Sequence, residues 1–185
     1  NDILLSHARQ GFTVKHPATL GAQLAEAFRQ EYGGRAFVVN PPDVDEFIDE
    51  ARITGLKGVY RESRIHALNQ KEIAIRYAAK AGTVPEKLNL IICHIGGGIS
   101  VTAHRQGRMI DSNDIANGDG PLAPTRCGQL PVRDVIRLCY SGKFTARQMY
   151  DKVTKTGGLV DHLGTSDARE VGRRIADGDA YAKLI

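Results

Sequence analysis

The sequence predicts an α/β protein, and three features support this prediction. Segments with apolar residues three and four positions apart, typical of helices, alternate with short apolar runs typical of strands. The pairs Gly33-Gly34 and Pro41-Pro42 stand between such segments and would end the elements that precede them. The apolar run 88–93 is followed by three glycines and an alternating run, which predicts two strands joined by a glycine turn.

Most of the predicted elements are helices. Apolar spacing predicts them over 20–32, 43–53, 69–81, 131–140, 145–155 and 167–176. The first would end at Gly33-Gly34, because glycine readily terminates a helix. The second has acids at its start, where the helix dipole favours negative charge. In the third, Asn69 is a plausible cap and Gly82 a plausible end.

The predicted strands are short. They lie over 36–39, 88–93, 100–104 and 108–111. Gln106-Gly107 would join the last two strands in a hairpin. The junction of Asn40 with Pro41-Pro42 ends the first strand and is the candidate boundary between two lobes. A loop over 113–129, rich in Gly, Pro and Asp, is long for a connector, and such loops usually have a function.

The composition is that of an ordinary soluble globular protein, with 42% hydrophobic and 25% charged residues among 185. No apolar run approaches the roughly 18 residues that a membrane helix needs. The net charge of +4 is spread along the chain without a basic block, so it suits small anionic substrates as well as nucleic acid. We therefore expect neither nucleic acid nor a membrane as a partner.

The three cysteines are too widely spaced to indicate a zinc site or a disulfide framework. Cys93 and Cys139 lie in apolar runs, and we expect both thiols to be buried. A reducing cytoplasm fits this cysteine usage best.

Gly96, Gly97 and Gly98 raise the question of whether their turn binds phosphate. A Walker loop needs Gly-Lys-Ser/Thr, and Ile99-Ser100 offers no lysine. A dinucleotide fingerprint needs a helix after its glycines, whereas a strand is predicted here. Strand, glycine turn, strand is the phosphate-hairpin geometry of the actin and sugar-kinase superfamily, in which backbone N–H groups form the anion site. A plain hairpin turn could carry the same glycines, so the glycines alone leave both readings open.

Further motifs, in the same order along the chain, resemble the acetate and butyrate kinase family from about residue 16 to about residue 169. They are 94–111 (HIGGGISVTAHRQGRMID), 120–126 (GPLAPTR), 159–169 (LVDHLGTSDAR), 50–55 (EARITG) and 64–71 (RIHALNQK). The last two look like the butyrate kinase branch. The resemblance implies an actin-like, sugar-kinase (ribonuclease H-like) fold: mixed sheets flanked by helices, in two lobes with an active-site cleft.

The resemblance also implies that the chain is an incomplete part of this fold. Residues 1–40 would be the last part of the N-terminal lobe, and 41–185 most of the second, nucleotide-binding lobe without its C-terminus. The family's first phosphate hairpin and substrate arginine, and its second adenosine loop and metal-associated glutamate, would lie outside the 185 residues. We therefore expect the chain alone to be inactive.

Members of this family transfer the γ-phosphate of ATP, with Mg²⁺, reversibly to a short-chain carboxylate, giving an acyl phosphate and ADP. Both reactants are anionic, so catalysis mainly needs cations and backbone donors that align them. The resemblance implies butyrate or a branched short-chain fatty acid as the substrate. It also implies a homodimer or higher homo-oligomer for the complete enzyme.

The resemblance assigns catalytic roles to Arg126, His66, His94 and Asn40, and substrate binding to Arg126 and His16. Arg126 matches the active-site arginine, whose planar fork of donors suits a carboxylate or a phosphoryl group. His66 matches a histidine that stabilises the phosphoryl group in flight, and His94 opens the phosphate hairpin, where it could donate to a phosphate. His16 corresponds to a histidine near the interlobe cleft, where substrate binding and a structural role are equally plausible.

Nucleotide-binding roles follow from the same resemblance. Gly96, Gly97 and Gly98 would let phosphates approach the backbone, where any Cβ would intrude. Asp167 and Arg169 match the nucleoside segment, in which the acid accepts from ribose hydroxyls and the guanidinium lies against adenine. A helix-capping acid beside an ordinary exposed arginine is the competing explanation for this pair.

Asn40 departs from the family, which usually has an aspartate there that is associated with Mg²⁺ and phosphoryl positioning. An amide can coordinate but lacks the charge. A neutral ligand could suffice, Asp43 or Asp45 could substitute, or activity could be weakened; the metal ligands stay unassigned.

Two alternatives to butyrate kinase chemistry stay open. One is an acetate or propionate kinase, because a methylene contributes only about 1–3 kcal/mol of discrimination in an acyl pocket. The other is a nucleotide-binding actin-like module without catalysis, since one fold serves many functions. Asn40 favours the second alternative, whereas Arg126, His66 and His94 together argue against it.

Overall fold

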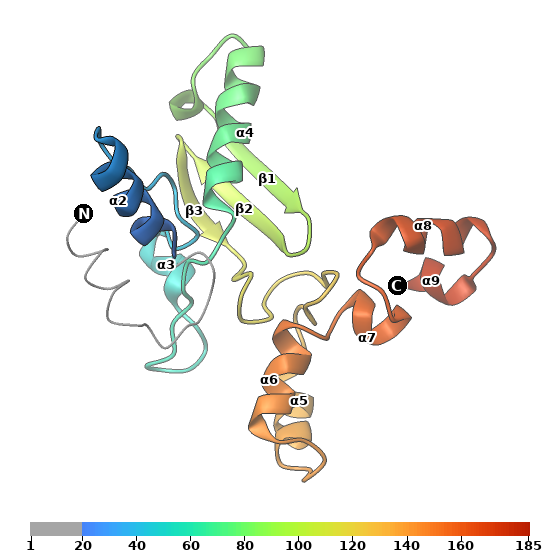
Figure 1. Ribbon diagram of the computed structural model, residues 1–185. Helices are drawn as coiled ribbons and strands as arrows, with labels where there is room; N and C mark the ends of the chain where they lie inside the picture. Colours follow the sequence, from blue (N-terminus) through green and yellow to red (C-terminus); the bar gives the residue numbers. More distant parts are fainter. Residues whose placement is uncertain (1–19) are drawn as a thin grey trace. The chain divides into compact units, whose positions relative to one another are not determined.

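The computed structural model describes residues 20–185 (Figure 1). His16, a predicted site residue, lies outside the described residues. The chain divides into two compact units, Asn1–Pro41 and Pro42–Ile185. The boundary falls beside the predicted proline junction, and the assignment of the two units to lobes stays a prediction.

The described part of the first unit contains helix α2, Gly21–Tyr32, as predicted. The strand predicted over 36–39 is wrong, because this segment forms no regular element. Phe37 and Val39 are 64% and 61% exposed. A strand needs a neighbouring strand for its N–H and C=O groups, and none of the residues from 20 onward pairs with this segment.

The second unit is built on an antiparallel sheet of three strands in the order β1-β2-β3 (Figure 1). The strands are β1 (Asn89–Ile95), β2 (Ile99–Arg105) and β3 (Arg108–Ser112), and they confirm the predicted hairpins. A short 3₁₀ turn, η2 (Pro85–Lys87), precedes β1. Gln106 and Gly107 both have positive φ, which matches the right-handed twist of the strands they join.

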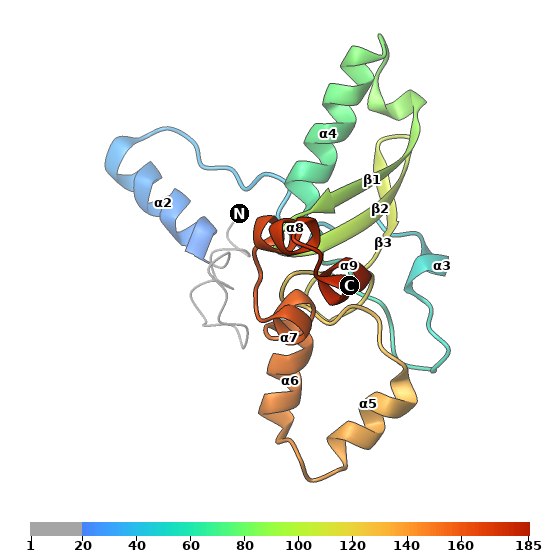
Figure 2. The same ribbon diagram turned by 90° about the vertical axis from the view of Figure 1, so that its right-hand side faces the viewer.

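Helix α4 (Ala67–Lys80) lies along one face of this sheet (Figure 2). Ala74 and Ala78 are buried and small, so the helix can approach the strands closely. The helix begins two residues earlier than predicted, and Asn69 is therefore not its cap but lies within its first turn. Gly82 follows the helix with φ +67, a conformation that favours glycine.

The helix predicted over 43–53 is wrong for most of its length, because α3 spans only Asp49–Arg52. The preceding residues are extended and tied to the sheet instead. The Glu46 carboxylate accepts hydrogen bonds from Lys71 Nζ (2.6 and 2.8 Å) and from the Met109 N–H (2.7 Å). These tertiary bonds outweigh the local helical preference.

Within the second unit, the face of the sheet opposite α4 is exposed along β1. Ile91 and Ile95 on this face are 76% and 77% exposed. Cys93 lies between them and is exposed, so its predicted burial is wrong: alternation along β1 directs it away from α4. Cys139, in α5, is also exposed, contrary to prediction.

Helices form the remainder of the chain. They are α5 (Val132–Cys139), α6 (Ala146–Thr154), α7 (Leu159–Leu163), α8 (Ala168–Ala176) and α9 (Ala180–Leu184). The sequence predicted α5, α6 and α8 but not α7 and α9, which are too short to show a periodicity. Leu163, Val171 and Ala182 bury one another and join the last three helices. None of the helices between residues 20 and 185 is long and apolar enough to cross a membrane.

Candidate functional site

Three segments far apart in sequence meet at the glycine turn between β1 and β2. His66 immediately precedes α4, His94 lies near the end of β1, and Arg126 comes from the loop over 113–129. The two imidazole rings are stacked, with centroids 3.7 Å apart and planes 15° from parallel. Arg126 Nη1 donates to the Gly97 carbonyl oxygen at 3.1 Å. The structure thus brings together three of the four predicted catalytic side chains.

The glycines leave room for these side chains. A Cβ on Gly98 would lie 2.6 Å from Arg126 Nη1 and 3.5 Å from His66 Cε1. A Cβ on Gly96 would lie 2.9 Å from His94 Nε2. Gly97 has open space around it, with no atom within 4 Å of an added Cβ. A side chain at Gly96 or Gly98 would therefore displace His94 or Arg126 from its position, whereas Gly97 lies on the accessible side of the turn.

The loop that carries Arg126 is held to the hairpin by Asn113. Its Oδ1 accepts the Val101 N–H (2.8 Å) and its Nδ2 donates to the Ile99 carbonyl (2.9 Å), so its amide continues the pairing beyond β3. Near Arg126, the Ala123 N–H donates to the Arg126 carbonyl (3.1 Å). These bonds fix the loop although it has no regular structure.

The local charge is positive and lacks a balancing acid. Arg126 forms no ion pair with any residue from 20 onward. Burial, together with the neighbouring cationic groups His94 and Arg126, lowers the pKa of His66 to about 4. His66 is therefore neutral at physiological pH, which also avoids placing two cationic rings in a stack. The cluster offers the positive charge of Arg126 beside a neutral His66, an arrangement suited to an anion.

The low pKa of His66 predicts an acid-sensitive fold. The unfolded chain binds this proton with the ordinary pKa of 6.5, whereas the folded chain binds it only near 4. Between these values the unfolded state holds more protons, so stability falls as pH falls from 6.5 towards 4. Urea unfolding between pH 6.5 and pH 4 should show that the free energy of unfolding falls more steeply with pH in the natural chain than in His66→Gln. Parallel curves would contradict the assignment, because the carboxylates contribute equally to both.

Sequence reasoning missed two neighbours of the histidines. Asn69 Nδ2 lies 2.8 Å from His94 Nδ1, and Ser100 Oγ lies 3.0 Å from His66 Nδ1. Asn69 lies in the first turn of α4, three residues after His66, so its closeness in sequence was a signal for it. Ser100 carried no comparable signal, because only the strand register places it opposite His94.

Asp167 and Arg169 lie apart from the cluster. Asp167 caps α8 by accepting the Arg169 N–H (2.9 Å), and its carboxylate also pairs with the Arg169 guanidinium (3.1 Å). No hydrogen bond, ion pair or ring contact joins this described pair to the glycine turn. Asn40 belongs to the first unit and has φ +44, a left-handed conformation that asparagine tolerates.

The part of the chain from residue 20 onward contains no group of three His, Cys, Asp or Glu side chains that could hold a metal ion. Asp45, suggested as a substitute ligand, is committed to the guanidinium of Arg52 and the N–H of Phe47. These contacts hold its pKa below the ordinary value, with the Arg52 hydrogen bond as the largest cause. Among residues 20–185, neither a cluster of three such ligands nor an uncommitted Asp45 carboxylate is therefore present for Mg²⁺.

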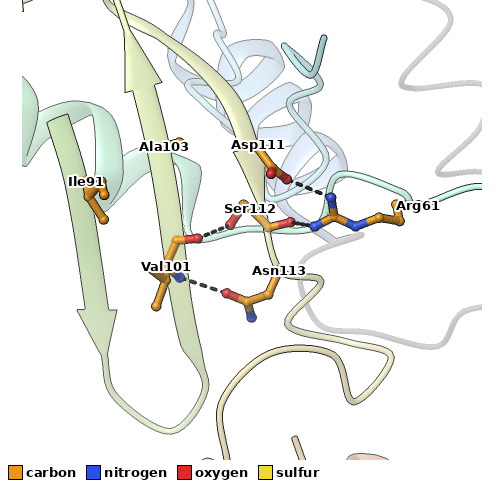
Figure 3. Close-up of a pocket in the computed structure, with 7 residues that line it drawn as sticks. All are labelled: Arg61, Ile91, Val101, Ala103, Asp111, Ser112 and Asn113. Carbon is orange, nitrogen blue, oxygen red and sulfur yellow. Dashed lines mark hydrogen bonds and ion pairs between the residues drawn. The ribbon is translucent and has the colours of Figure 1, made fainter. Parts of the chain in front are cut away.

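A separate hollow of about 190 Å³ lies on the opposite face of the sheet (Figure 3). Its lining consists of Arg61, Ile91, Val101, Ala103, Asp111, Ser112 and Asn113. None of the predicted site residues lines this hollow. The β2 residues that line it alternate with Ser100 and Thr102, which face α4, so the hollow and the histidine cluster lie on opposite faces of the sheet. Arg61 already bonds the Asp111 carboxylate at 2.8 Å, so the hollow offers no free cation.

Comparison with known proteins agrees with the motifs around this site. The model of the acetokinase family matches residues 57–185, more than half of the chain. The chain belongs to the acetokinase family. A probable butyrate kinase 2 from Caldanaerobacter subterraneus is 47% identical over all 185 residues, and butyrate kinase 2 from Clostridium acetobutylicum is 40% identical over 184. The chain spans about half (52%) the length of these curated relatives.

Solved structures show the fold of this acetokinase family member. An acetate kinase from Porphyromonas gingivalis superimposes with a TM-score of 0.68 at 23% identity, covering 75% of this chain and 37% of that one. A propionate kinase from Francisella tularensis gives 0.66 at 24% identity, with the same coverage of both chains. The chain therefore has part of the actin-like fold of these kinases, which confirms the predicted fold class.

Proposed function

We propose that the protein to which this chain belongs is an acyl kinase that transfers the γ-phosphate of ATP reversibly to butyrate or a branched short-chain fatty acid. The observation that supports it best is Arg126, a cation without an acidic partner among residues 20–185, beside two stacked histidines on a glycine turn. The names of the butyrate kinase relatives support the acyl acceptor.

Each residue of the cluster has a distinct part in the proposed reaction. The Arg126 guanidinium holds the substrate carboxylate or the transferring phosphoryl group with a planar pair of donors. Neutral His66 donates a hydrogen bond to a phosphoryl oxygen without adding charge, and His94 donates a second. The open side of Gly97 admits the phosphate chain to the backbone. Positioning and charge neutralisation then supply most of the catalysis, as in other phosphoryl transfers.

Mg²⁺ is part of the proposal because it would supply charge neutralisation for the phosphates of ATP. The described residues do not hold it by themselves, so we assign it no protein ligand.

Nucleotide binding is tested by calorimetric titration of this chain with Mg²⁺-ADP. Saturable binding is expected, and Arg169→Ala should weaken it roughly fivefold, because guanidinium stacking contributes about 1 kcal/mol. Arg173→Ala, also exposed on α8, is the matched control and should leave the affinity unchanged. Equal affinity for all three chains would remove Arg169 from the nucleoside site and leave it as the partner of the capping acid.

Acyl specificity requires a complete enzyme, for which a chimera is suitable. In it, this chain replaces the matching segment of the Caldanaerobacter relative, to which it is 47% identical. Trapping of the acyl phosphate product should give a higher kcat/KM for butyrate and isobutyrate than for acetate. A preference for acetate or propionate would support the alternative substrate class instead.

Asn40 favours one second candidate, a nucleotide-binding module without catalysis. The same chimera with Asn40→Asp distinguishes the two. An unchanged turnover is expected if the amide suffices in an active kinase. A gain of more than about tenfold, equal to about 1.4 kcal/mol of barrier, would mean that the natural residue impairs catalysis.

A further inference from the structure

A buried chain of polar side chains connects the interior of the sheet to His66. It consists of His104, Gln70 and Ser100, which lie between α4 and the strands and are 3%, 0% and 0% exposed. The His104 Nε2 to Gln70 Oε1 distance is 3.3 Å, and Gln70 Nε2 lies 3.0 Å from Ser100 Oγ. Ser100 Oγ in turn lies 3.0 Å from His66 Nδ1.

Backbone carbonyls fix the orientation of the Gln70 amide. Gln70 Nε2 lies 3.3 Å from the carbonyl oxygens of both Ile92 and Ser100. A carbonyl oxygen only accepts hydrogen bonds, so the NH₂ group must face these two atoms. Gln70 Oε1 is then on the other side, where it accepts from His104 Nε2.

The orientation of Gln70 determines the direction of the next bond. Three acceptors surround the two hydrogens of the Gln70 NH₂ group, and Ser100 Oγ is the nearest of them at 3.0 Å. Ser100 Oγ therefore accepts from Gln70 Nε2, and its own hydrogen is free to be donated elsewhere. The acceptor within reach is His66 Nδ1. If His66 donated from Nδ1 instead, the buried hydroxyl hydrogen of Ser100 would lose this partner, at a cost that buried polar groups avoid.

We propose that Gln70 and Ser100 are positioning residues that hold neutral His66 in the tautomer with hydrogen on Nε2. Nδ1 is occupied by the Ser100 hydroxyl, so only Nε2 can meet a ligand, and it does so as a donor. Its use towards a phosphoryl oxygen rests on the proposed kinase function, whereas the tautomer itself does not.

His94 has a related arrangement that is less enclosed. Asn69 Nδ2 donates to His94 Nδ1 at 2.8 Å, which leaves hydrogen on His94 Nε2. Asn69 is exposed, whereas Ser100 is fully buried. The tautomer of His66 is therefore the more firmly determined of the two.

Long-range ¹H–¹⁵N spectra of the 185-residue chain near neutral pH test this proposal directly. Natural His66 is expected to carry hydrogen on Nε2, with an unprotonated Nδ1. Ser100→Ala should shift the tautomer ratio roughly fivefold towards Nδ1–H, the equivalent of a hydrogen bond of about 1 kcal/mol. Thr102→Val, which removes another fully buried hydroxyl from the same face of β2, should leave the ratio unchanged.

Gln70→Glu tests the direction of the chain. When ionised, the new carboxylate can only accept, so the Ser100 hydroxyl would turn towards it and His66 would have to donate from Nδ1. The protonated acid would donate as the Gln70 amide does and keep the natural tautomer, so the spectra are recorded on both sides of the titration of this carboxyl group. The expected result is a reversed tautomer; should this buried acid prevent folding, Ser100→Ala alone decides. Natural His66 with hydrogen on Nδ1, or a ratio unaffected by Ser100→Ala, would overturn the proposal. Because the spectra need neither nucleotide nor turnover, this result is independent of the kinase assay.

Discussion

Arg126→Ala should reduce turnover by at least ~10³-fold, because an arginine that stabilises a transferring phosphoryl group contributes 10³–10⁵ in rate. The affinity for ADP should change little, since Arg126 bonds the glycine turn through a single contact and does not support it. The measurement pairs kcat in the chimera with an ADP titration of the same protein. Arg126 has no acidic partner among the described residues, so its removal leaves no carboxylate unpaired.

One further variant separates the charge of Arg126 from the shape of its guanidinium, and a second serves as a control. Arg126→Lys keeps the charge but loses the planar fork, and should recover only part of the lost rate. Arg133→Ala, which removes an exposed arginine on α5, should leave the rate unchanged. A parallel loss of turnover and ADP affinity in Arg126→Ala would contradict the proposed role and indicate a structural arginine.

Gly158→Ala should lower the free energy of unfolding by about 3 kcal/mol or more. Gly158 has φ +66 and ψ −138, a conformation that costs other residues about 1–3 kcal/mol. An added Cβ would also overlap the carbonyl oxygen of Ala123 and lie 2.6 Å from that of Arg126. The start of α7 and the Arg126 loop would have to separate, so loss of turnover should accompany the loss of stability in denaturant unfolding.

Gly164→Ala is the matched control at the other end of α7. Gly164 also has positive φ, +73, but nothing lies within 4 Å of its added Cβ. Only the cost of the left-handed backbone conformation remains, so the free energy of unfolding should fall by about 1–2 kcal/mol. Equal losses in the two variants would show that contact with the Arg126 loop contributes nothing.

Local patterns were sufficient where an element is determined by its own residues. The hairpins were predicted because alternation and the Gln106-Gly107 turn are local signals, and these same strands bring Ser100 opposite His94. The strand predicted over 36–39 is wrong, because a strand needs a neighbouring strand and the local pattern does not show whether one exists. The helix over 43–53 failed since Glu46 bonds groups far along the chain.

The residues of the site also divide into those that local motifs identify and those whose contacts depend on tertiary packing. His66, His94 and Arg126 were identified through motifs, and the structure places them together. Asn69 and Ser100 act through these residues, and their contacts depend on how α4 packs on the sheet, which no single segment encodes. The roles assigned to Asp167, Arg169 and Asn40 stay predictions.

The uncovered face of the sheet has a consequence for handling the chain in solution. β1 is an edge strand, so its outer N–H and C=O groups have no neighbouring strand among the described residues. It also exposes Ile91 and Ile95, and an apolar edge of this kind is a template for strands of other molecules. Self-association of the chain should therefore start at β1 and rise with concentration, and a lysine in place of Ile91 would act as a gatekeeper against it.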